Sequence, residues 1–284
     1  MGSRATDLLT LGEGVEWSSF EAAAAAHEAV DPRYGRLGDL VEWLAGAQGA
    51  ADPRSPTRPR CVVFGTAGEA ARALAATLDV GLREVRLDPA ATVPDALALG
   101  VAAADEEVDA GADLIVVVDG DDSAASALSV SLLAGVEPVA LLPRGAAAID
   151  TAAWIARAEY LRDARRTVAG LRDDPAGLLT ALGHAPLAAT SGFVLRATAR
   201  RTPLVLDGST AAAAALICHH VQPRSSRWWR FADSSPDALH GRVLAELGQR
   251  PLLDLAISAG DGTAGLLTLP LLRAAVGGHV GSQG

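Results

Sequence analysis

The residues best suited to chemistry form a short turn late in the sequence, where Gly260, Asp261, Gly262 and Thr263 follow one another. Glycines permit a sharp turn and a close approach of the backbone to a ligand. The turn can therefore present the Asp261 carboxylate to a pocket as a general base. The same residues also suit a helix N-cap, because an apolar helix is expected directly afterwards, at residues 264–275. On the residues alone, both interpretations stay open.

A second acidic turn follows the most β-branched apolar run of the sequence, residues 114–118. It holds three carboxylates, a glycine and a serine: Asp119, Gly120, Asp121, Asp122 and Ser123. Carboxylates crowded on one turn can hold Mg²⁺, as in a metal-dependent phosphohydrolase. Asp and Gly are also the ordinary residues of a solvated turn, in which Asp122 or Ser123 would cap the next helix.

The six histidines form no cluster along the sequence. His240 is the strongest site candidate among them, because it follows Ser234 and Ser235 early in an expected helix. A single histidine without a partner does not define a role, however. The loop at residues 65–69 lacks the spacing of nucleotide-binding glycine loops, and the spacings of zinc proteases and of serine hydrolases are absent from the sequence.

The composition excludes several classes of partner. The net charge is −10, which argues against a nucleic-acid-binding surface. All 24 basic residues are Arg. The two cysteines, Cys61 and Cys218, are far apart and are expected in the core rather than in a disulfide or metal site. Neither a signal segment nor an apolar run of membrane-spanning length is found, so we expect a cytoplasmic protein that does not contact a membrane.

Short apolar runs alternate with amphipathic segments along most of the chain. The runs expected to be strands are residues 61–64, 83–87, 114–118, 139–142, 203–206, 228–231 and 252–257. The expected helices are residues 19–29, 37–48, 69–78, 94–109, 123–133, 151–165, 175–182, 187–196, 209–220, 237–247 and 264–275. This alternation predicts an α/β fold with a mostly parallel sheet covered by helices on both faces. Ligands bind such sheets at the carboxyl ends of the strands.

The expected domain organisation follows from a linker. Residues 49–59 are rich in Pro, Ala and Ser, which is typical of a loop between structural units. We therefore expect an N-terminal helical segment and linker at residues 1–58 and an α/β domain at residues 59–284. Residues 1–18 are expected to be poorly ordered.

Three segments of the chain, in the same order, resemble the nicotinate-nucleotide–dimethylbenzimidazole phosphoribosyltransferases. They are residues 104–113 (ADEEVDAGAD), 202–208 (TPLVLDG) and 251–263, which contain PLLDL and GDGT. The resemblance extends over most of the chain from about residue 32, and the chain is shorter than the family pattern mainly between residues 65 and 100. It implies a Rossmann-like parallel sheet, a small helical lobe built from both chain ends and a homodimer.

The resemblance also implies a reaction and its site. Phosphoribose would pass from nicotinate mononucleotide to a benzimidazole nitrogen, without a metal or other cofactor, to form α-ribazole phosphate for the lower ligand of cobalamin. The catalytic glutamate of the family falls on Asp261, beside Gly260, Gly262 and Thr263, and its nearby arginine falls on Ser258. A shorter acid withdraws the carboxylate by about 1 Å.

The remaining family positions are implied to bind the ribose phosphate. The glycine–threonine loop of the family falls on the turn with Gly120 and Ser123, where carboxylates would repel a phosphate. A second glycine loop falls on Gly145, next to Arg144, and the family lysine falls on Arg157. A histidine- and serine-containing segment survives as three residues, Ser234, Ser235 and His240.

Two functional hypotheses follow from this mixture of matches and departures. The chain is either a working transferase of the family or a catalytically degenerate member. A degenerate member would act as a binding protein or would pair with an intact paralogue. A metal-dependent phosphohydrolase that uses Asp119, Asp121 and Asp122 is a third hypothesis.

Overall fold

The computed structural model describes residues 7–121, 123–142 and 150–281. Its centre is a five-stranded parallel sheet with the strand order β2-β1-β3-β4-β5. The strands are β1 (Pro59–Phe64), β2 (Gly81–Val85), β3 (Leu114–Val118), β4 (Leu204–Asp207) and β5 (Trp229–Phe231). The predicted parallel α/β sheet is therefore confirmed.

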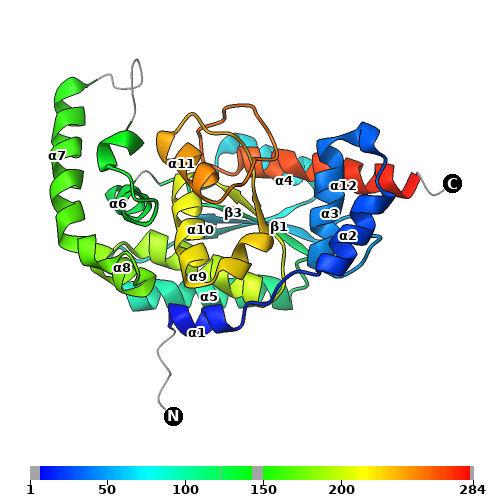
Figure 1. Ribbon diagram of the computed structural model, residues 1–284, viewed down its shortest axis with the longest axis horizontal. Coiled ribbons are helices and arrows are strands. Elements are labelled where there is room, and N and C mark those ends of the chain that lie inside the picture. The colour runs from blue at the N-terminus through cyan, green and yellow to red at the C-terminus, as the bar shows by residue number, and fades with distance from the viewer. Residues whose placement is uncertain (1–6, 122, 143–149, 282–284) are drawn as a thin grey trace, which may run out of the picture.

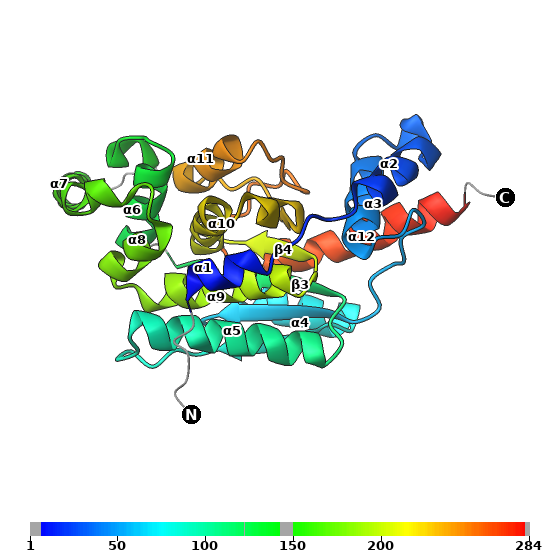
Figure 2. The ribbon, with the colours of Figure 1, turned by 60° about the horizontal axis from the view of Figure 1, so that its bottom comes forward.

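Helices cover both faces of the sheet (Figures 1 and 2). The α-helices are α1 (Leu8–Glu13), α2 (Phe20–Ala29), α3 (Arg36–Gln48), α4 (Glu69–Leu78), α5 (Val93–Asp109), α6 (Ala124–Leu133), α7 (Thr151–Val168), α8 (Pro175–Leu182), α9 (Ala185–Ala199), α10 (Ser209–Val221), α11 (Ala238–Glu246) and α12 (Thr263–Gly281). Short 3₁₀ helices are η1 (Pro32–Tyr34), η2 (Pro138–Leu141), η4 (Ala169–Leu171) and η5 (Pro223–Arg227). None of these described helices is long and apolar enough to cross a bilayer.

The central strand β3 is apolar throughout because its successive side chains enter two different cores. In β3, Ile115 and Val117 join the core on the side of α5, α9 and α10. Leu114, Val116 and Val118 join the core formed with α3, α4 and α12. Cys61 lies in the second core and Cys218 in the first, both fully buried as free thiols, which confirms the core assignment of the cysteines.

Helices α2 and α3 meet the C-terminal helix α12 in a helical lobe at one side of the sheet, whereas α1 packs against α9. Figure 1 shows α2, α3 and α12 together at the right, while α7 lies at the far left. Residues 7–18 are more ordered than expected, because Asp7 caps α1 and Leu8 and Val15 are buried, and residues 1–6 lie outside the described residues. The Trp228 indole also donates a hydrogen bond to the Glu16 carbonyl at 2.8 Å.

Two of the predicted strands are wrong. Residues 139–142 overlap η2, which Pro138 starts and which pairs with no strand. Residues 252–257 form only an isolated bridge between Leu253 and Asp233. Ala256 there has a φ of 56°, which breaks the extended conformation. The Asp233 carboxylate, rather than a neighbouring strand, accepts the N–H groups of Leu255 and Ile257.

Three loops meet backbone to backbone at the carboxyl ends of the strands. A Cβ on Gly120 would lie 2.2 Å from the Gly260 carbonyl oxygen, and one on Gly208 would lie 2.3 Å from the Asp119 carbonyl oxygen. Gly208 and Gly260 also have φ values of 106° and 54°, which disfavour side chains. We call this contact of Gly120, Gly208 and Gly260 the glycine junction.

The glycine junction predicts the effect of an added methyl group. Gly120→Ala should lower the free energy of unfolding by about 1–3 kcal/mol, because the new Cβ meets backbone that cannot rotate away. Gly241→Ala is the matched control, since a Cβ there meets nothing within 4 Å on helix α11. The free energy of unfolding of this control should rise by roughly 0.5–1 kcal/mol, because alanine favours a helix more than glycine does. Urea unfolding of the two variants measures the difference, and equal stabilities would contradict the junction.

Candidate functional site

A small hollow opens where the strand-end loops surround the glycine junction. It is lined by Gly120, Leu206, Asp207, Gly208, Ser209, Asp233, Ser235, His240, Ile257, Ser258 and Gly260. These residues come from the end of β4 and the start of α10, from α11, and from the loops after β3 and β5 and before α12. We call it the strand-end hollow. It occupies the edge of the sheet at which the strand order predicts a ligand.

Two buried carboxylates line the strand-end hollow, Asp207 with 6% of its surface exposed and Asp233 with 4%. The Asp207 Oδ2 accepts the Gly265 N–H at 2.9 Å, so it fixes the first turn of α12 against β4. Burial, followed by the charges of Asp261 and Asp233, raises the pKa of Asp207 to about 6. A carboxylate with such a pKa can accept and return a proton near neutral pH.

Asp233 shapes the opposite wall. Its two carboxylate oxygens accept the N–H groups of Leu255 and Ile257, each at 2.7 Å. The contact compensates for the absent sheet pairing and holds the 255–257 segment over the hollow. Ser258, at the position implied to have lost the family arginine, follows this segment and lines the hollow.

Asp119 lies beneath the hollow rather than in it. It is fully buried, and its Oδ2 accepts the Thr190 hydroxyl at 2.6 Å. Burial raises the pKa of Asp119 to about 7. Asp121 instead points to His184, with 3.2 Å between Oδ2 and Nε2. Within the described chain no three acidic, histidine or cysteine side chains are grouped closely enough to hold a metal ion, and Asp122 lies outside that part.

His184 connects the acidic turn to helix α9. Its Nδ1 accepts the Leu187 N–H at 3.2 Å, which makes it the N-cap of α9. Since Nδ1 accepts, Nε2 carries the ring proton and faces Asp121. Burial lowers the pKa of His184, although the charge of Asp121 opposes that effect.

Hydroxyl groups hold the acidic turn from below. Ser123 caps helix α6 by accepting the Ser126 N–H at 3.1 Å. Its hydroxyl also lies 2.8 Å from that of Ser126, which in turn lies 2.7 Å from the Thr210 hydroxyl. The Thr210 hydroxyl lies 2.6 Å from the Asp121 carbonyl oxygen. Ser123 was expected to bind substrate, and the structure places it in this capping network outside the hollow lining.

Asp261 also lies outside the lining of the hollow. Its Oδ1 accepts the Thr263 N–H at 3.0 Å in the turn before α12, and the Gly262 carbonyl, rather than that of Asp261, accepts the first helical hydrogen bond from Leu266. Its carbonyl accepts the Gly68 N–H at 3.2 Å, and a Cβ on Gly68 would lie 1.8 Å from Asp261 Oδ2. The carboxylate therefore fits against Gly68 at the start of α4. Gly262 and Thr263 are directed to the sheet and α12, not to the hollow.

The segment after β5 supplies two expected residues to the hollow, Ser235 and His240. The His240 ring is 2% exposed and meets Phe231 edge to face at 5.6 Å. Burial lowers the pKa of His240, and its Nδ1 has no hydrogen-bond partner among the described residues. Ser234 hydrogen-bonds Asp254 instead of lining the hollow.

Among the remaining expected residues, Arg157 does not line the hollow. Arg157 lies on α7, which Figure 1 shows at the far side of the molecule from the lobe of α2, α3 and α12. Arg144 and Gly145 lie outside the described residues. Sequence reasoning did not select Ser209, Asp233, Thr190 or Gly68, and it left Asp207 without a role. An aspartate at the end of an apolar run was the available signal for Asp207 and Asp233.

Comparisons with known proteins agree with this architecture. A family model described as phosphoribosyltransferase matches residues 69–281. The nicotinate-nucleotide–dimethylbenzimidazole phosphoribosyltransferase of Mycobacterium avium (strain 104) is 36% identical over 318 aligned positions, covering 90% of each chain. The protein of the same name from Streptomyces avermitilis is 35% identical, covering 85% of this chain and 80% of that one. The chain belongs to this phosphoribosyltransferase family.

A solved structure supports the phosphoribosyltransferase fold independently of sequence. The crystal structure of CobT from Thermus thermophilus aligns with a TM-score of 0.78, covering 90% of this chain and 95% of that chain. Only 22% of the sequence is identical, so this likeness concerns the fold. The resemblance read from the sequence is confirmed at the level of the phosphoribosyltransferase family and its parallel sheet.

The raised pKa of Asp119 predicts a pH-dependent difference in stability. A folded-state pKa of about 7 lies above the value of about 3.9 for an unfolded aspartate, so protonation favours the folded state. That contribution is complete below about pH 4 and is lost as pH rises through about 7. Asp119→Asn should therefore gain stability relative to the unchanged protein between about pH 4 and 7, and the gain should level off above that range.

Thermal unfolding across this pH range measures the gain. Asp52→Asn is the control, because Asp52 is exposed and makes no side-chain hydrogen bond or ion pair in the described structure. A difference between Asp119→Asn and the unchanged protein that stays constant with pH would contradict the raised pKa.

Proposed function

We propose that this chain transfers phosphoribose from nicotinate mononucleotide to dimethylbenzimidazole. The observation that carries the proposal is the convergence of the strand-end loops, with their carboxylates, on one hollow. Family membership supports it, because relatives named for this reaction are 36% identical across 90% of the chain. The product would be α-ribazole phosphate, and the released base would be nicotinate.

The proposed reaction requires one proton acceptor. A benzimidazole nitrogen attacks C1 of the ribose as the bond to the nicotinate nitrogen breaks, and the azole N–H proton must leave. We assign this proton to Asp261, the acid at the catalytic turn implied by the family resemblance. Asp207 assists by holding Gly265 and by its buried charge near Asp261. Asp261 must turn from its Thr263 contact to reach the hollow.

The charge of the hollow favours a second candidate, a family member without catalytic activity. Asp207 and Asp233 line the hollow, whereas none of its described lining residues is an arginine. Ser258 stands where the resemblance implies an arginine that would hold the phosphate. Carboxylates repel a phosphate dianion in a poorly solvated site. Such a member would bind a base or pair with an intact paralogue, whereas the transferase is expected to form a homodimer.

Substitution of Asp261 tests the transferase. The unchanged protein, given nicotinate mononucleotide and dimethylbenzimidazole, should release nicotinate only when both are present. Asp261→Asn should lower kcat by about 10²-fold or more with little change in KM, because a general base is lost but binding is not. Asp261→Glu should retain or raise activity, since the longer arm reaches further. Asp52→Asn, at an exposed position, should match the unchanged protein.

If neither the unchanged protein nor Asp261→Glu releases nicotinate, the transferase hypothesis is rejected in favour of the inactive family member. Titration with nicotinate mononucleotide and gel filtration then characterise that member. Heteromer formation with an intact relative would support a partner role, and micromolar binding of the nucleotide by this chain alone would oppose it.

A further inference from the structure

A second and larger opening lies at the base of the helical lobe, on residues unrelated to the strand-end hollow. It has a volume of about 570 Å³, within the range of roughly 300–1,000 Å³ of small-molecule sites. Its lining is Arg36, Asp39, Leu40, Glu42, Ser226, Arg227, Arg230, Leu247, Gly248, Gln249, Arg250 and Leu252. We call it the arginine groove. It shares no described lining residue with the strand-end hollow.

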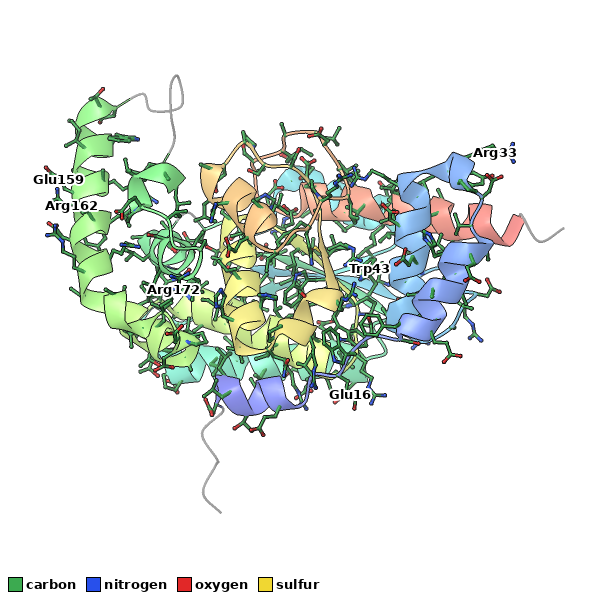
Figure 3. The ribbon with its side chains drawn as sticks, viewed as in Figure 1. Glu16, Arg33, Trp43, Glu159, Arg162 and Arg172 are labelled. Carbon is green, nitrogen blue, oxygen red and sulfur yellow. The ribbon has the colours of Figure 1, made fainter. Side chains whose placement is uncertain are left out.

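Trp43 of α3 supports one wall of the arginine groove. Figure 3 shows this side chain between the lobe and the rest of the molecule. Its indole N–H donates to the Arg227 carbonyl at 3.2 Å, which ties α3 to η5. The Arg230 guanidinium lies 5.1 Å from the centre of the Trp43 ring, a cation–π contact. The backbone of Arg227 and the side chain of Arg230 are thereby held in place before any ligand arrives.

The other two arginines come from the segments on either side. Arg36 donates a hydrogen bond to the Pro251 carbonyl, which fixes the start of α3 against the 249–252 segment. Arg250 makes no side-chain hydrogen bond or ion pair in the described structure, and it is exposed. The groove therefore combines positioned guanidinium groups with one that is free to approach a ligand.

The positive charge of the groove is not balanced by ion pairs. In the described part of the chain, none of its four guanidinium groups lies within 4.0 Å of a carboxylate oxygen. The Arg227 guanidinium lies 4.9 Å from the centre of the Phe20 ring, and Glu42 Oε2 lies 3.2 Å from His27 Nδ1. Burial, and next the charge of Arg227, lowers the pKa of Arg230 to about 10, while the charges of Glu42 and Asp39 oppose that effect. Two cations that repel each other in a half-buried site favour a bound anion.

We propose that the arginine groove binds the phosphate group of a small phosphate monoester. Guanidinium forks match phosphate oxygens in geometry and form charge-assisted hydrogen bonds with them. Four arginines against Asp39 and Glu42 leave a net positive charge that suits a dianion. The strand-end hollow, lined by carboxylates, offers the opposite environment. The phosphate site of this groove is thus separate from the proposed transfer site.

Direct titration tests the proposal. Inorganic phosphate and ribose 5-phosphate are each titrated into the intact protein at low salt by calorimetry. Ribose 5-phosphate should bind more tightly than inorganic phosphate, and sodium chloride should weaken both, because exposed charges are screened. Arg227→Gln and Arg250→Gln should each weaken binding by about tenfold or more, the scale of a lost charge-assisted hydrogen bond.

Arg54→Gln is the matched control, since Arg54 is exposed and does not line the groove. It should change affinity by less than about twofold. Absence of binding at millimolar concentrations, or equal weakening by Arg54→Gln, would overturn the proposal. Binding of inorganic phosphate alone would assign the groove to the free ion and overturn the monoester assignment.

A stability measurement shows whether the variants still fold. In phosphate-free buffer Arg227→Gln should unfold close to the temperature of the unchanged protein, because the relieved repulsion of Arg230 offsets the lost contact with the Phe20 ring. Added ribose 5-phosphate should stabilise the unchanged protein and not the variant, since a ligand stabilises the state that binds it. Equal stabilisation of both would refute the role of Arg227.

Discussion

The contact of three loop backbones at Gly120, Gly208 and Gly260 is the constraint on which the functional edge of the sheet depends. Each loop follows a separate strand or turn, and none of the three has room for a side chain there. The contact brings Asp207 and Asp233 into one hollow with Ser235 and His240. It also places the Asp261 turn beside them while directing its carboxylate to Gly68. Backbone packing therefore determines which side chains at this edge of the sheet can reach the hollow.

The periodicity of the sequence predicted most of the fold because both faces of the sheet are buried. β3, α4 and α8 begin and end at the expected residues, since apolar runs and capping residues mark their limits. The two wrong strands share a cause. Residues 139–142 and 252–257 are apolar enough for strands, but the first segment pairs with no strand and the second continues beyond β5 only as an isolated bridge at Leu253. Asp233 takes the hydrogen bonds of the second segment, and such a long-range side-chain contact leaves no local pattern.

The site was predicted less completely than the fold. Family resemblance pointed to Gly120, Ser235, His240 and Gly260, which do share the hollow. It could not indicate which way the Asp261 carboxylate turns, because that depends on the space left by Gly68, far away in the sequence. Ser123 and Ser234 proved to be occupied by local contacts. Asp233 and Ser209 line the hollow only because the segments after β4 and β5 meet in the folded protein, and the sequence gives no local sign of that contact.

Helix α12 has a consequence for how the protein is made. Ala264, Leu266, Leu269 and Leu272 of this helix complete the core that β1 and β3 begin on one face of the sheet. A nascent chain can pair these strands and pack α3 and α4 on that face once β3 has been synthesised, but the part that α12 covers stays exposed until residue 272 leaves the ribosome. Apolar strand surface left uncovered for so long is a target for aggregation.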